Sequence, residues 1–307
     1  MKIIYFGHNQ RGFKCLQALV EKRIPIVTLV VQEKPQAGTI AKQMVTLAKR
    51  HKIPWICQPD PNKADFVSRM RSLKPDCLVL AGFTGILRKE ALSVALKCSI
   101  NLHGGRLPAY RGASVLNWQI LDGNKRIVIS VIEVSSVLDT GPILCQRSFP
   151  LSLEEDFNYV AAKSLELFPE MLIKTLKEIE QGTIKKKPQK LSEGIYHFKR
   201  YPDDGRINWT IMNAKTILNL IRAVAPPAGP GAFTYRNKEK IIVAKASLIE
   251  DARFRGMPGR VGMAITSAGR TGRVVCAQDK ALLVEKIFHS GKYVDAKIYL
   301  KPGEMLL

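Results

Sequence analysis

Alternating strand and helix patterns in the first half of the chain constrain its fold more than any other feature. Residues 3–6, 24–31 and 77–81 are short apolar runs, typical of strands buried on both faces, and apolar residues at helical spacing separate them. This alternation predicts an α/β fold with a doubly wound, mostly parallel sheet. In such sheets ligands bind beyond the carboxyl ends of the strands. We therefore expect a binding site among the loops 7–12, 82–87, 103–112 and 138–141, on one rim of the sheet.

The second half of the chain has a different pattern. A long helical pattern ends near residue 182, and a basic segment broken by proline follows at 185–190. Short β-rich runs dominate from residue 232 onward. We predict an α/β domain over 1–183, a linker over 184–206 and a smaller β-rich, OB-like domain over 207–307.

Charge and composition narrow the classes of function. The chain has 48 Lys and Arg against 26 Asp and Glu, a net charge of +22, which favours polyanionic partners such as RNA or nucleotides. No apolar run approaches the roughly 20 residues of a membrane span, and the first residues lack a signal-peptide pattern. We therefore expect a cytoplasmic protein with no membrane partner. The six cysteines and five histidines are dispersed, so we expect no metal site.

Three polar residues in the first domain have the chemistry of acyl transfer. Asn101 and His103 lie two positions apart at a predicted strand end, so their side chains share a face. Asp139 follows a later strand, predicted to end on the same rim, and an amide, an imidazole and a carboxylate together can stabilise an oxyanion and move a proton. From spacing alone the alternative stays open that His103 is an ordinary polar residue and Asp139 a turn former.

A family resemblance favours the catalytic interpretation. The string NLHGGRLPAYRGA and the later LDTGPIL resemble the signature of the folate-dependent formyltransferases. This superfamily includes glycinamide ribonucleotide transformylase, methionyl-tRNA formyltransferase and nucleotide-sugar N-formyltransferases. LAGFTGIL is similar to the folate-pocket loop of the family. DDGRINW, LIRAV and PGAFTY look like motifs in the second domain of the tRNA and sugar enzymes.

The resemblance implies a reaction and roles for individual residues. Residues 1–183 are then a catalytic domain that transfers a formyl group from 10-formyltetrahydrofolate to a primary amine, without a metal. Asn101 would stabilise the oxyanion, and His103, oriented by Asp139, would move the proton. The folate would contact Gly82, Phe83, Thr84, Ile86, Leu87, Val134 and Leu138. The acceptor, through its phosphate in particular, would contact Gly7, His8, Asn9, Gln10, Arg106, Tyr110 and Arg111.

The acceptor is the least constrained part of this interpretation. The motifs look closest to those of the aminoarabinose-type sugar enzymes, so we expect a nucleotide-linked amino sugar as acceptor and a homodimer as one candidate oligomeric state. Methionyl-tRNA is the alternative, although residues 32–42 lack a clustered basic insertion. A non-catalytic nucleic-acid-binding protein is a further alternative, and a purine-pathway transformylase is disfavoured because it has no use for a second domain. Arg106 replaces a usually apolar residue, and Asn208 replaces a usual Asp.

Overall fold

The computed structural model describes residues 1–58, 60–249, 262–265, 272–277 and 280–307. The chain divides into two compact units. The first comprises Met1–Gly112, Val128–Phe149 and Ala162–His197, and the second comprises Ala113–Ile127, Pro150–Ala161 and Phe198–Leu307. The domain boundaries placed at 183 and 206 from the sequence stay predictions.

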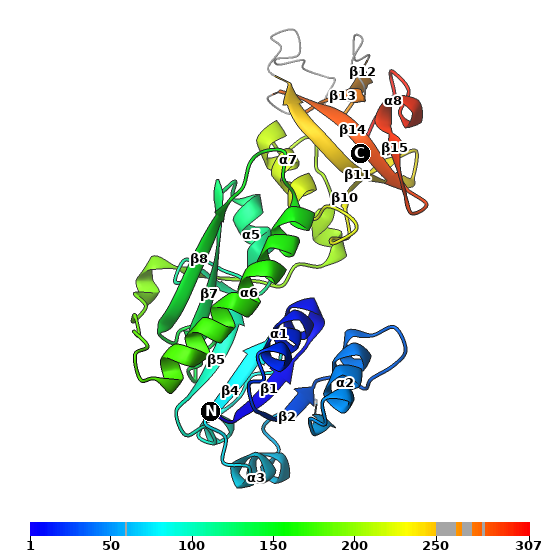
Figure 1. The fold of residues 1–307 in the computed structure, drawn as a ribbon. Coiled ribbons are helices and arrows are strands. Elements are labelled where there is room, and N and C mark those ends of the chain that lie inside the picture. The colour runs from blue at the N-terminus through cyan, green and yellow to red at the C-terminus, as the bar shows by residue number, and fades with distance from the viewer. Residues whose placement is uncertain (59, 250–261, 266–271, 278–279) are drawn as a thin grey trace. The chain divides into compact units, whose positions relative to one another are not determined.

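A seven-stranded sheet forms the centre of the first unit (Figure 1). Its order is β3-β2-β1-β4-β5-β7-β8. The first five of these strands run parallel to their neighbours, whereas β7 runs antiparallel to β5. The strands are β1 Ile3–Gly7, β2 Ile26–Val31, β3 Trp55–Cys57, β4 Cys77–Ala81, β5 Cys98–His103, β7 Arg126–Glu133 and β8 Ile143–Pro150. The predicted mostly parallel sheet is confirmed.

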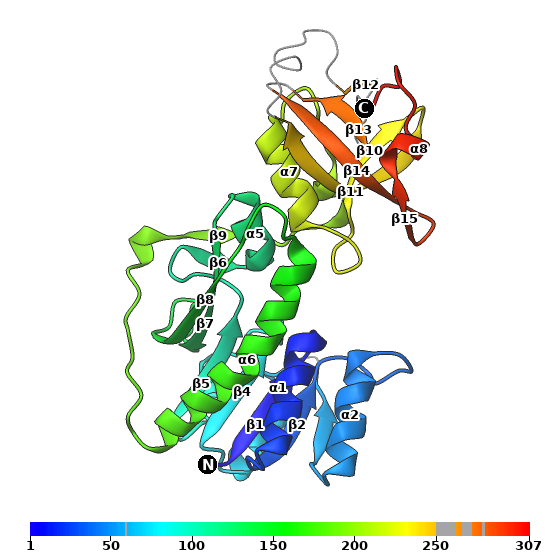
Figure 2. The ribbon, with the colours of Figure 1, turned by 45° about the horizontal axis from the view of Figure 1, so that its top comes forward.

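Helices cover both faces of this sheet because the side chains of its strands alternate between two apolar layers. On one face, Phe6 of β1 packs edge-on against Phe66 of α3, with ring centroids 6.4 Å apart. On the other face, the buried Tyr5 hydroxyl donates a hydrogen bond to the Gly12 carbonyl oxygen of α1, at 2.7 Å. The helices that accompany the sheet are α1 Asn9–Glu21, α2 Ile40–Arg50, α3 Ala64–Ser72, α4 Lys89–Leu92 and α6 Phe157–Glu180. Figure 2 labels α1, α2 and α6 beside the sheet.

The second unit contains an antiparallel sheet, as the β-rich pattern predicted. Its strands follow the order β10-β11-β14-β13-β12, and β15 pairs with β14. Apolar residues of α7, including Ile217 and Ile221, share one core cluster with residues of the sheet such as Val243 and Leu282. The elements are α5 Val115–Leu121, α7 Ala214–Ala223, β10 Ala232–Arg236, β11 Glu239–Ile249, β12 Ala264–Ile265, β13 Arg273–Cys276, β14 Ala281–His289, β15 Lys292–Asp295 and α8 Ala296–Tyr299.

The predicted linker contains regular structure of its own. It includes the short 3₁₀ turns η1 Leu191–Glu193 and η2 Pro202–Gly205 and the strand β9 Ile195–His197. In the first unit β9 pairs in parallel with β6 Tyr110–Gly112, which follows the expected catalytic strand. The first half of the linker is therefore built into the neighbourhood of the predicted site.

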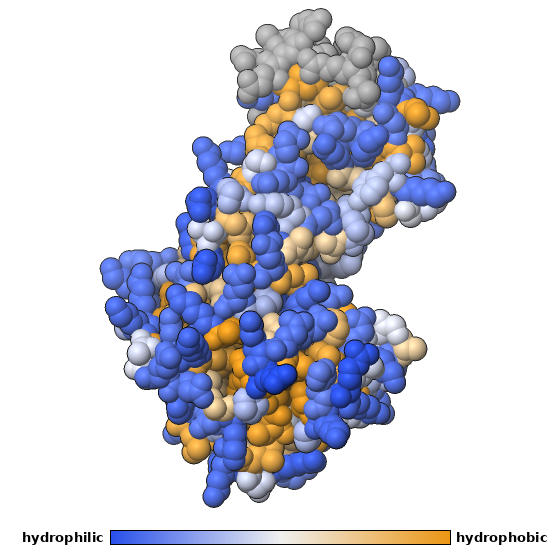
Figure 3. Space-filling model, in the orientation of Figure 1, coloured by the Kyte–Doolittle hydropathy of each residue, from blue (hydrophilic) through white to orange (hydrophobic). Residues whose placement is uncertain are grey.

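The surface is largely hydrophilic on the face drawn in Figure 3, and apolar side chains show between the polar ones. Within the part of the chain that the structure describes, no helix combines the length and the apolar character needed to cross a membrane.

Candidate active site

Two of the predicted catalytic residues lie at the carboxyl end of β5. Asn101 and His103 are separated by one residue and leave the same face of the strand. The His103 side chain is 5% exposed, and Asn101 is half-buried. Among the described residues, no hydrogen-bond partner is found for the Asn101 side-chain amide. This amide is therefore available to a bound molecule.

Asp139 reaches the site by a route that the sequence analysis predicted wrongly. We expected the strand that precedes Asp139 to end on the same rim as His103. Instead, β7 ends at Glu133, which pairs with Ile100 in the antiparallel partner β5. The chain then folds back through the loop 134–142, in which Asp139 adopts the left-handed conformation with φ 54°. The carboxylate is thus carried to His103 by a loop.

The structure brings the carboxylate and the imidazole together. Asp139 Oδ1 lies 3.5 Å from His103 Nδ1, and both side chains are at most 5% exposed. Asp139 Oδ2 accepts a hydrogen bond from the Gly112 amide at 2.9 Å. His103 Nε2 lies 2.6 Å from the Tyr110 carbonyl oxygen, which can only accept, so Nε2 carries a proton. In the neutral imidazole the lone pair is then on Nδ1, beside Asp139.

Close packing fixes the orientation of the imidazole. A Cβ atom at Gly105 would lie 2.6 Å from His103 Nε2 and would also collide with the Tyr110 carbonyl oxygen. Glycine is therefore required at position 105 for steric reasons, and the ring has little freedom to turn.

Opposing effects act on the protonation of His103. Burial lowers the pKa of the imidazole below its ordinary value because the charged form loses hydration. The Asp139 charge and the Tyr110 carbonyl raise the pKa, whereas the nearby Arg11 charge lowers it further. The net effect is a lowered pKa, which leaves a neutral imidazole able to accept a proton at neutral pH.

Arg11 is a site residue that the sequence analysis missed. Its Nη1 donates to the Leu102 carbonyl oxygen at 2.8 Å, and its guanidinium lies 4.6 Å from the centre of the Phe168 ring. The sequence analysis placed the loop 7–12 on the rim of the site, but no motif singled out Arg11 within it.

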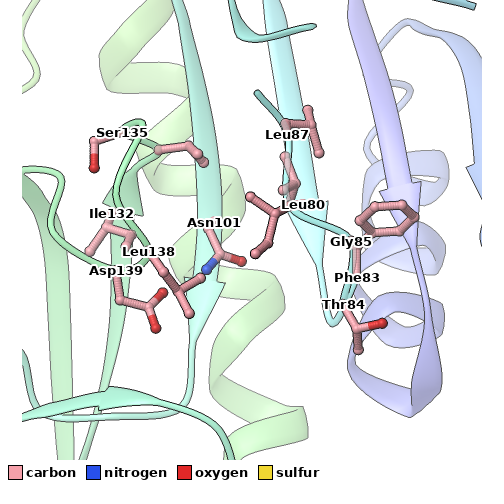
Figure 4. A pocket seen from close by; sticks show the side chains of 12 residues that line it. Leu80, Phe83, Thr84, Gly85, Leu87, Asn101, Ile132, Ser135, Leu138 and Asp139 are labelled. Carbon is pink, nitrogen blue, oxygen red and sulfur yellow. The ribbon is translucent and has the colours of Figure 1, made fainter. Parts of the chain in front are cut away.

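A pocket opens next to Asn101 and Asp139 (Figure 4). Figure 4 shows Asn101 between the Leu138–Asp139 loop on one side and Leu80 with Phe83 and Thr84 on the other. Six of the seven predicted folate contacts line this pocket, and Gly82 does not. Phe83 and Leu87 also belong to a core cluster, whereas Ile86 is exposed. The complete lining is Leu80, Phe83, Thr84, Gly85, Ile86, Leu87, Asn101, Ile132, Val134, Ser135, Leu138 and Asp139.

Two polar side chains that the sequence analysis missed hold one wall of this pocket. The Asn62 amide donates to the Ile86 carbonyl oxygen at 2.8 Å and accepts from the Arg88 amide at 2.7 Å. Gln32 Oε1 accepts from the Thr84 hydroxyl at 2.8 Å and from its amide at 3.2 Å. The loop that forms this wall is therefore held in place by hydrogen bonds from two other loops.

The predicted phosphate contacts at 7–10 lie at the start of α1, outside the pocket lining. The amide of Arg11, in the first turn of α1, donates to Asn9 Oδ1, and the His8 amide donates to the Ala81 carbonyl oxygen. His8 Nδ1 also lies 3.2 Å from a Glu33 carboxylate oxygen, whose negative charge disfavours a phosphate. Neither Gly7 nor Gln10 lines the pocket, so the phosphate site stays a prediction.

The predicted acceptor contacts at 106–111 differ in exposure. Arg106 is exposed, with its guanidinium 5.7 Å from the Tyr110 ring centre. Tyr110 is buried and stacks on His197. Arg111 is also buried, and its Nη2 donates to the carbonyl oxygens of Leu191 and Gly194. Arg106 alone of the three is free to meet a large ligand at the surface.

Within the described ranges, no group of three or more His, Cys, Asp or Glu side chains is placed to hold a metal ion.

Comparisons with known proteins identify the family and correct the expected acceptor. Residues 1–176 match the family Formyl transferase, and residues 199–302 match Formyl transferase, C-terminal domain. The chain is 31% identical over 312 residues to a methionyl-tRNA formyltransferase of Acetivibrio thermocellus, covering 99% of this chain and 98% of that protein. It is 32% identical over 295 residues to a methionyl-tRNA formyltransferase of Pelobacter propionicus, covering 94% and 89%.

Solved structures share the fold. An N-formyltransferase of Helicobacter canadensis, in complex with folinic acid and dTDP-3-aminofucose, has a TM-score of 0.68 at 16% identity, covering 92% of this chain and 98% of that one. HypX of Aquifex aeolicus, in complex with tetrahydrofolic acid, has a TM-score of 0.62 at 19% identity. The comparison covers 98% of this chain but 47% of HypX, so this chain spans about half of that protein.

These findings overturn the nucleotide-sugar acceptor that we inferred from the sequence. The sugar enzymes share the fold at low identity, whereas the relatives that match nearly end to end at about 30% identity carry the methionyl-tRNA name. The motif likeness to the sugar enzymes and the lack of a basic insertion at 32–42 therefore did not predict the acceptor that these relatives favour. The predicted family is confirmed: this chain belongs to the formyl transferase family.

Proposed function

We propose that this chain transfers the formyl group of 10-formyltetrahydrofolate to the amino group of methionyl-tRNA. The observation that carries the proposal is the convergence of Asn101, His103 and Asp139 beside the pocket, in a chain whose near-full-length relatives are named methionyl-tRNA formyltransferases. In an aminoacyl-tRNA the carboxyl group is esterified, so the primary amine of the methionyl group is its α-amino group. The net charge of +22 suits a polyanionic acceptor.

The pocket fits the folate donor chemically. Its walls are mostly apolar, from Leu80, Phe83 and Leu87 on one side to Ile132 and Leu138 on the other. Such walls suit the faces of a flat heterocycle, and backbone groups of the surrounding loops suit its polar edge. The bound donor supplies the electrophilic formyl carbon.

Asn101 would stabilise the charge that develops on the formyl oxygen. Its amide borders the pocket and has no partner among the described residues, so both of its N–H groups can donate. A single donor to an oxyanion contributes about 3–4 kcal/mol to transition-state stabilisation in other enzymes.

His103 would accept the proton that the attacking amine loses. The Tyr110 carbonyl oxygen holds the proton on Nε2, and the lone pair is therefore on Nδ1. Once Nδ1 is protonated, the imidazolium lies 3.5 Å from Asp139, whose charge stabilises it. Asp139 thus serves as an electrostatic partner of the base.

The test is direct formyl transfer with purified protein. We expect stable formylation of methionyl-tRNA in the presence of 10-formyltetrahydrofolate, and a loss of about 10²-fold or more in kcat for Asn101→Ala and His103→Ala. Arg106→Ala is a matched control at an exposed position just after β5. It should raise the KM for tRNA and leave kcat nearly unchanged.

Competing acceptors separate the alternatives in the same assay. UDP- and dTDP-linked amino sugars should remain unmodified at concentrations at which methionyl-tRNA is formylated. Transfer to a sugar with none to methionyl-tRNA would refute the proposed acceptor. Binding of tRNA with no transfer to any amine would instead refute the catalytic interpretation.

A further inference from the structure

We propose that Gln189, in the segment that the sequence analysis regarded as a linker, is a positioning residue that holds Asp139 against His103. The kinetic part of this inference rests on the proposed function, whereas its structural part can be tested without any substrate.

Gln189 donates hydrogen bonds to the backbone of the loop 134–142, which carries Asp139 and is called the catalytic loop below. Its Nε2 donates to the Asp139 carbonyl oxygen at 3.0 Å and to the Gly141 carbonyl oxygen at 2.6 Å. One amide group thereby uses both of its N–H donors on carbonyls that flank Thr140. These contacts join residues 48 and 50 positions apart in the sequence.

The catalytic loop needs such support because Asp139 is in an unfavourable backbone conformation. Its φ of 54° is left-handed, which costs an L-residue with a side chain about 1 kcal/mol or more. A conformation of this kind persists only where its surroundings hold it. If the loop relaxed, the carboxylate would leave both His103 and the Gly112 amide.

Tyr196, from the same segment, supports the loop at a second point. Its hydroxyl donates to the Leu138 carbonyl oxygen, and the Arg111 guanidinium lies 4.6 Å from its ring centre. Arg111 directly precedes Gly112, whose amide donates to Asp139 Oδ2. The segment 189–196 therefore contacts the loop through Leu138, Asp139 and Gly141.

The segment is itself fixed to the region that carries His103. The Arg111 guanidinium donates to the carbonyl oxygens of Leu191 and Gly194, at 3.0 and 2.6 Å. A Cβ at position 194 would collide with the Pro108 carbonyl group, so only glycine permits this approach. His197 stacks on Tyr110, with ring centroids 4.9 Å apart, and the Tyr110 carbonyl oxygen holds His103 Nε2.

The hydrogen bonds of Gln189 show that its side chain is held against the loop and does not point into solvent. Its Oε1 is buried and has no hydrogen-bond partner among the described residues. A buried acceptor without a partner is destabilising by about 1–3 kcal/mol. The side chain is therefore held in place by the two bonds that its Nε2 makes to the catalytic loop.

The first experiment follows the His103 imidazole by NMR in the substrate-free protein. Burial lowers the pKa of His103, Asp139 and the Tyr110 carbonyl raise it, and Arg11 lowers it, with a net lowering. Gln189→Leu should lower the pKa of His103 in the same direction as Asp139→Asn, because in both variants the imidazolium loses its carboxylate partner. Ser192→Ala, at an exposed position of the same segment, is the control and should leave the titration of His103 unchanged.

The second experiment is a double-mutant cycle on kcat. Gln189→Leu should reduce kcat by about 10²-fold, the effect expected when a catalytic group is misplaced by about 1 Å. In the Asp139→Asn background the same substitution should have little further effect on kcat, because the carboxylate that Gln189 positions is already absent. Tyr196→Phe, which keeps the ring and removes only the hydroxyl, should give a smaller loss of the same kind in a protein that folds normally.

The outcomes separate the two proposals. If Asp139→Asn leaves the pKa of His103 unchanged, the catalytic pairing in the proposed function is wrong. If Asp139→Asn lowers it but Gln189→Leu and Tyr196→Phe do not, the pairing stands and the positioning role is wrong. Equal losses of kcat for Gln189→Leu with and without Asp139 would also overturn the positioning role.

Discussion

At the scale of single residues, His103 is defined by what each of its two nitrogens meets. Nε2 faces a carbonyl oxygen at hydrogen-bond distance, whereas Nδ1 faces a carboxylate at 3.5 Å, which is longer than a hydrogen bond. The ring is therefore anchored on one side and has its lone pair free on the other. This asymmetry makes Nδ1 the expected base.

The pH dependence of catalysis should report on the Asp139 charge. Since Asp139 raises the pKa of His103, Asp139→Asn should lower that pKa and keep the imidazole neutral to more acid pH. The acid limb of the kcat/KM profile should therefore move to lower pH, while its plateau falls by about 10²-fold. An acid limb that stays in place would show that Asp139 does not act on the titrating group.

Two neighbouring cysteines should differ in reactivity because their environments shift the pKa values of their thiols in opposite directions. Cys77 and Cys98 lie on adjacent strands with their sulfur atoms 3.7 Å apart. The hydrogen bond between the two thiols lowers the pKa of Cys98, whereas the same bond and burial raise that of Cys77. Burial also raises the pKa of Cys145, which is partly exposed like Cys98.

Iodoacetamide should therefore alkylate Cys98 before Cys145, as followed by peptide mass spectrometry at mildly alkaline pH. Cys77→Ala removes the hydrogen-bond partner of Cys98 and should slow its alkylation. Faster labelling of Cys145 than of Cys98, or no effect of Cys77→Ala, would contradict this explanation.

At the scale of secondary-structure elements, the sequence predicted what depends on local pattern and missed what depends on distant backbone groups. β1, β2 and β4 are continuous apolar runs, and Asn101 and His103 follow from their place on β5. Nothing in the sequence showed that the loop 134–142 folds back, because its conformation depends on bonds from Gln189, which is distant in the chain. β9 was missed because three residues carry no periodic signal.

One departure from the family pattern has a structural explanation at this scale. Asn208 Oδ1 accepts hydrogen bonds from the Thr210 amide, the Thr210 hydroxyl and the Ile211 amide. All three bonds need only an acceptor, which Asp supplies equally well. Asn208→Asp should therefore change the free energy of unfolding by less than about 0.5 kcal/mol.

The matched variant Asn208→Leu removes the acceptor and should destabilise the protein by about 1 kcal/mol, as the loss of a capping side chain does. Thermal unfolding measures both effects. Equal melting temperatures for the two variants would show that these hydrogen bonds do not contribute to stability.

At the scale of the whole molecule, net charge rather than any single motif is the feature that suits a tRNA acceptor. The excess of basic residues is spread along the chain, and residues 32–42 hold no cluster of them. Motifs shared by two branches of a family cannot distinguish their acceptors. Identity of about 30% along nearly the whole chain to methionyl-tRNA formyltransferases is what favours the tRNA acceptor.

Binding to tRNA should depend steeply on salt, because each phosphate contact releases counterions. Between about 50 and 200 mM KCl we expect the affinity for methionyl-tRNA to fall on the order of 10²-fold or more. Filter binding measures this slope, and a donor analogue such as 5-formyltetrahydrofolate is a control whose affinity should vary far less. An affinity for tRNA that is insensitive to salt would contradict a phosphate-based interaction.

The pairing of β9 with β6 has a practical consequence for protein engineering. The first family match ends at residue 176 and the second begins at residue 199. From the matches alone, hybrid enzymes could be joined at any residue between these two positions. In a hybrid joined near residue 183, residue 189 and β9 would come from one parent enzyme and the loop that contains Asp139 from the other. A junction after His197 keeps β6, β9 and Gln189 from the same parent enzyme. Chimeras joined there should keep formyl-transfer activity that chimeras joined near residue 183 lose.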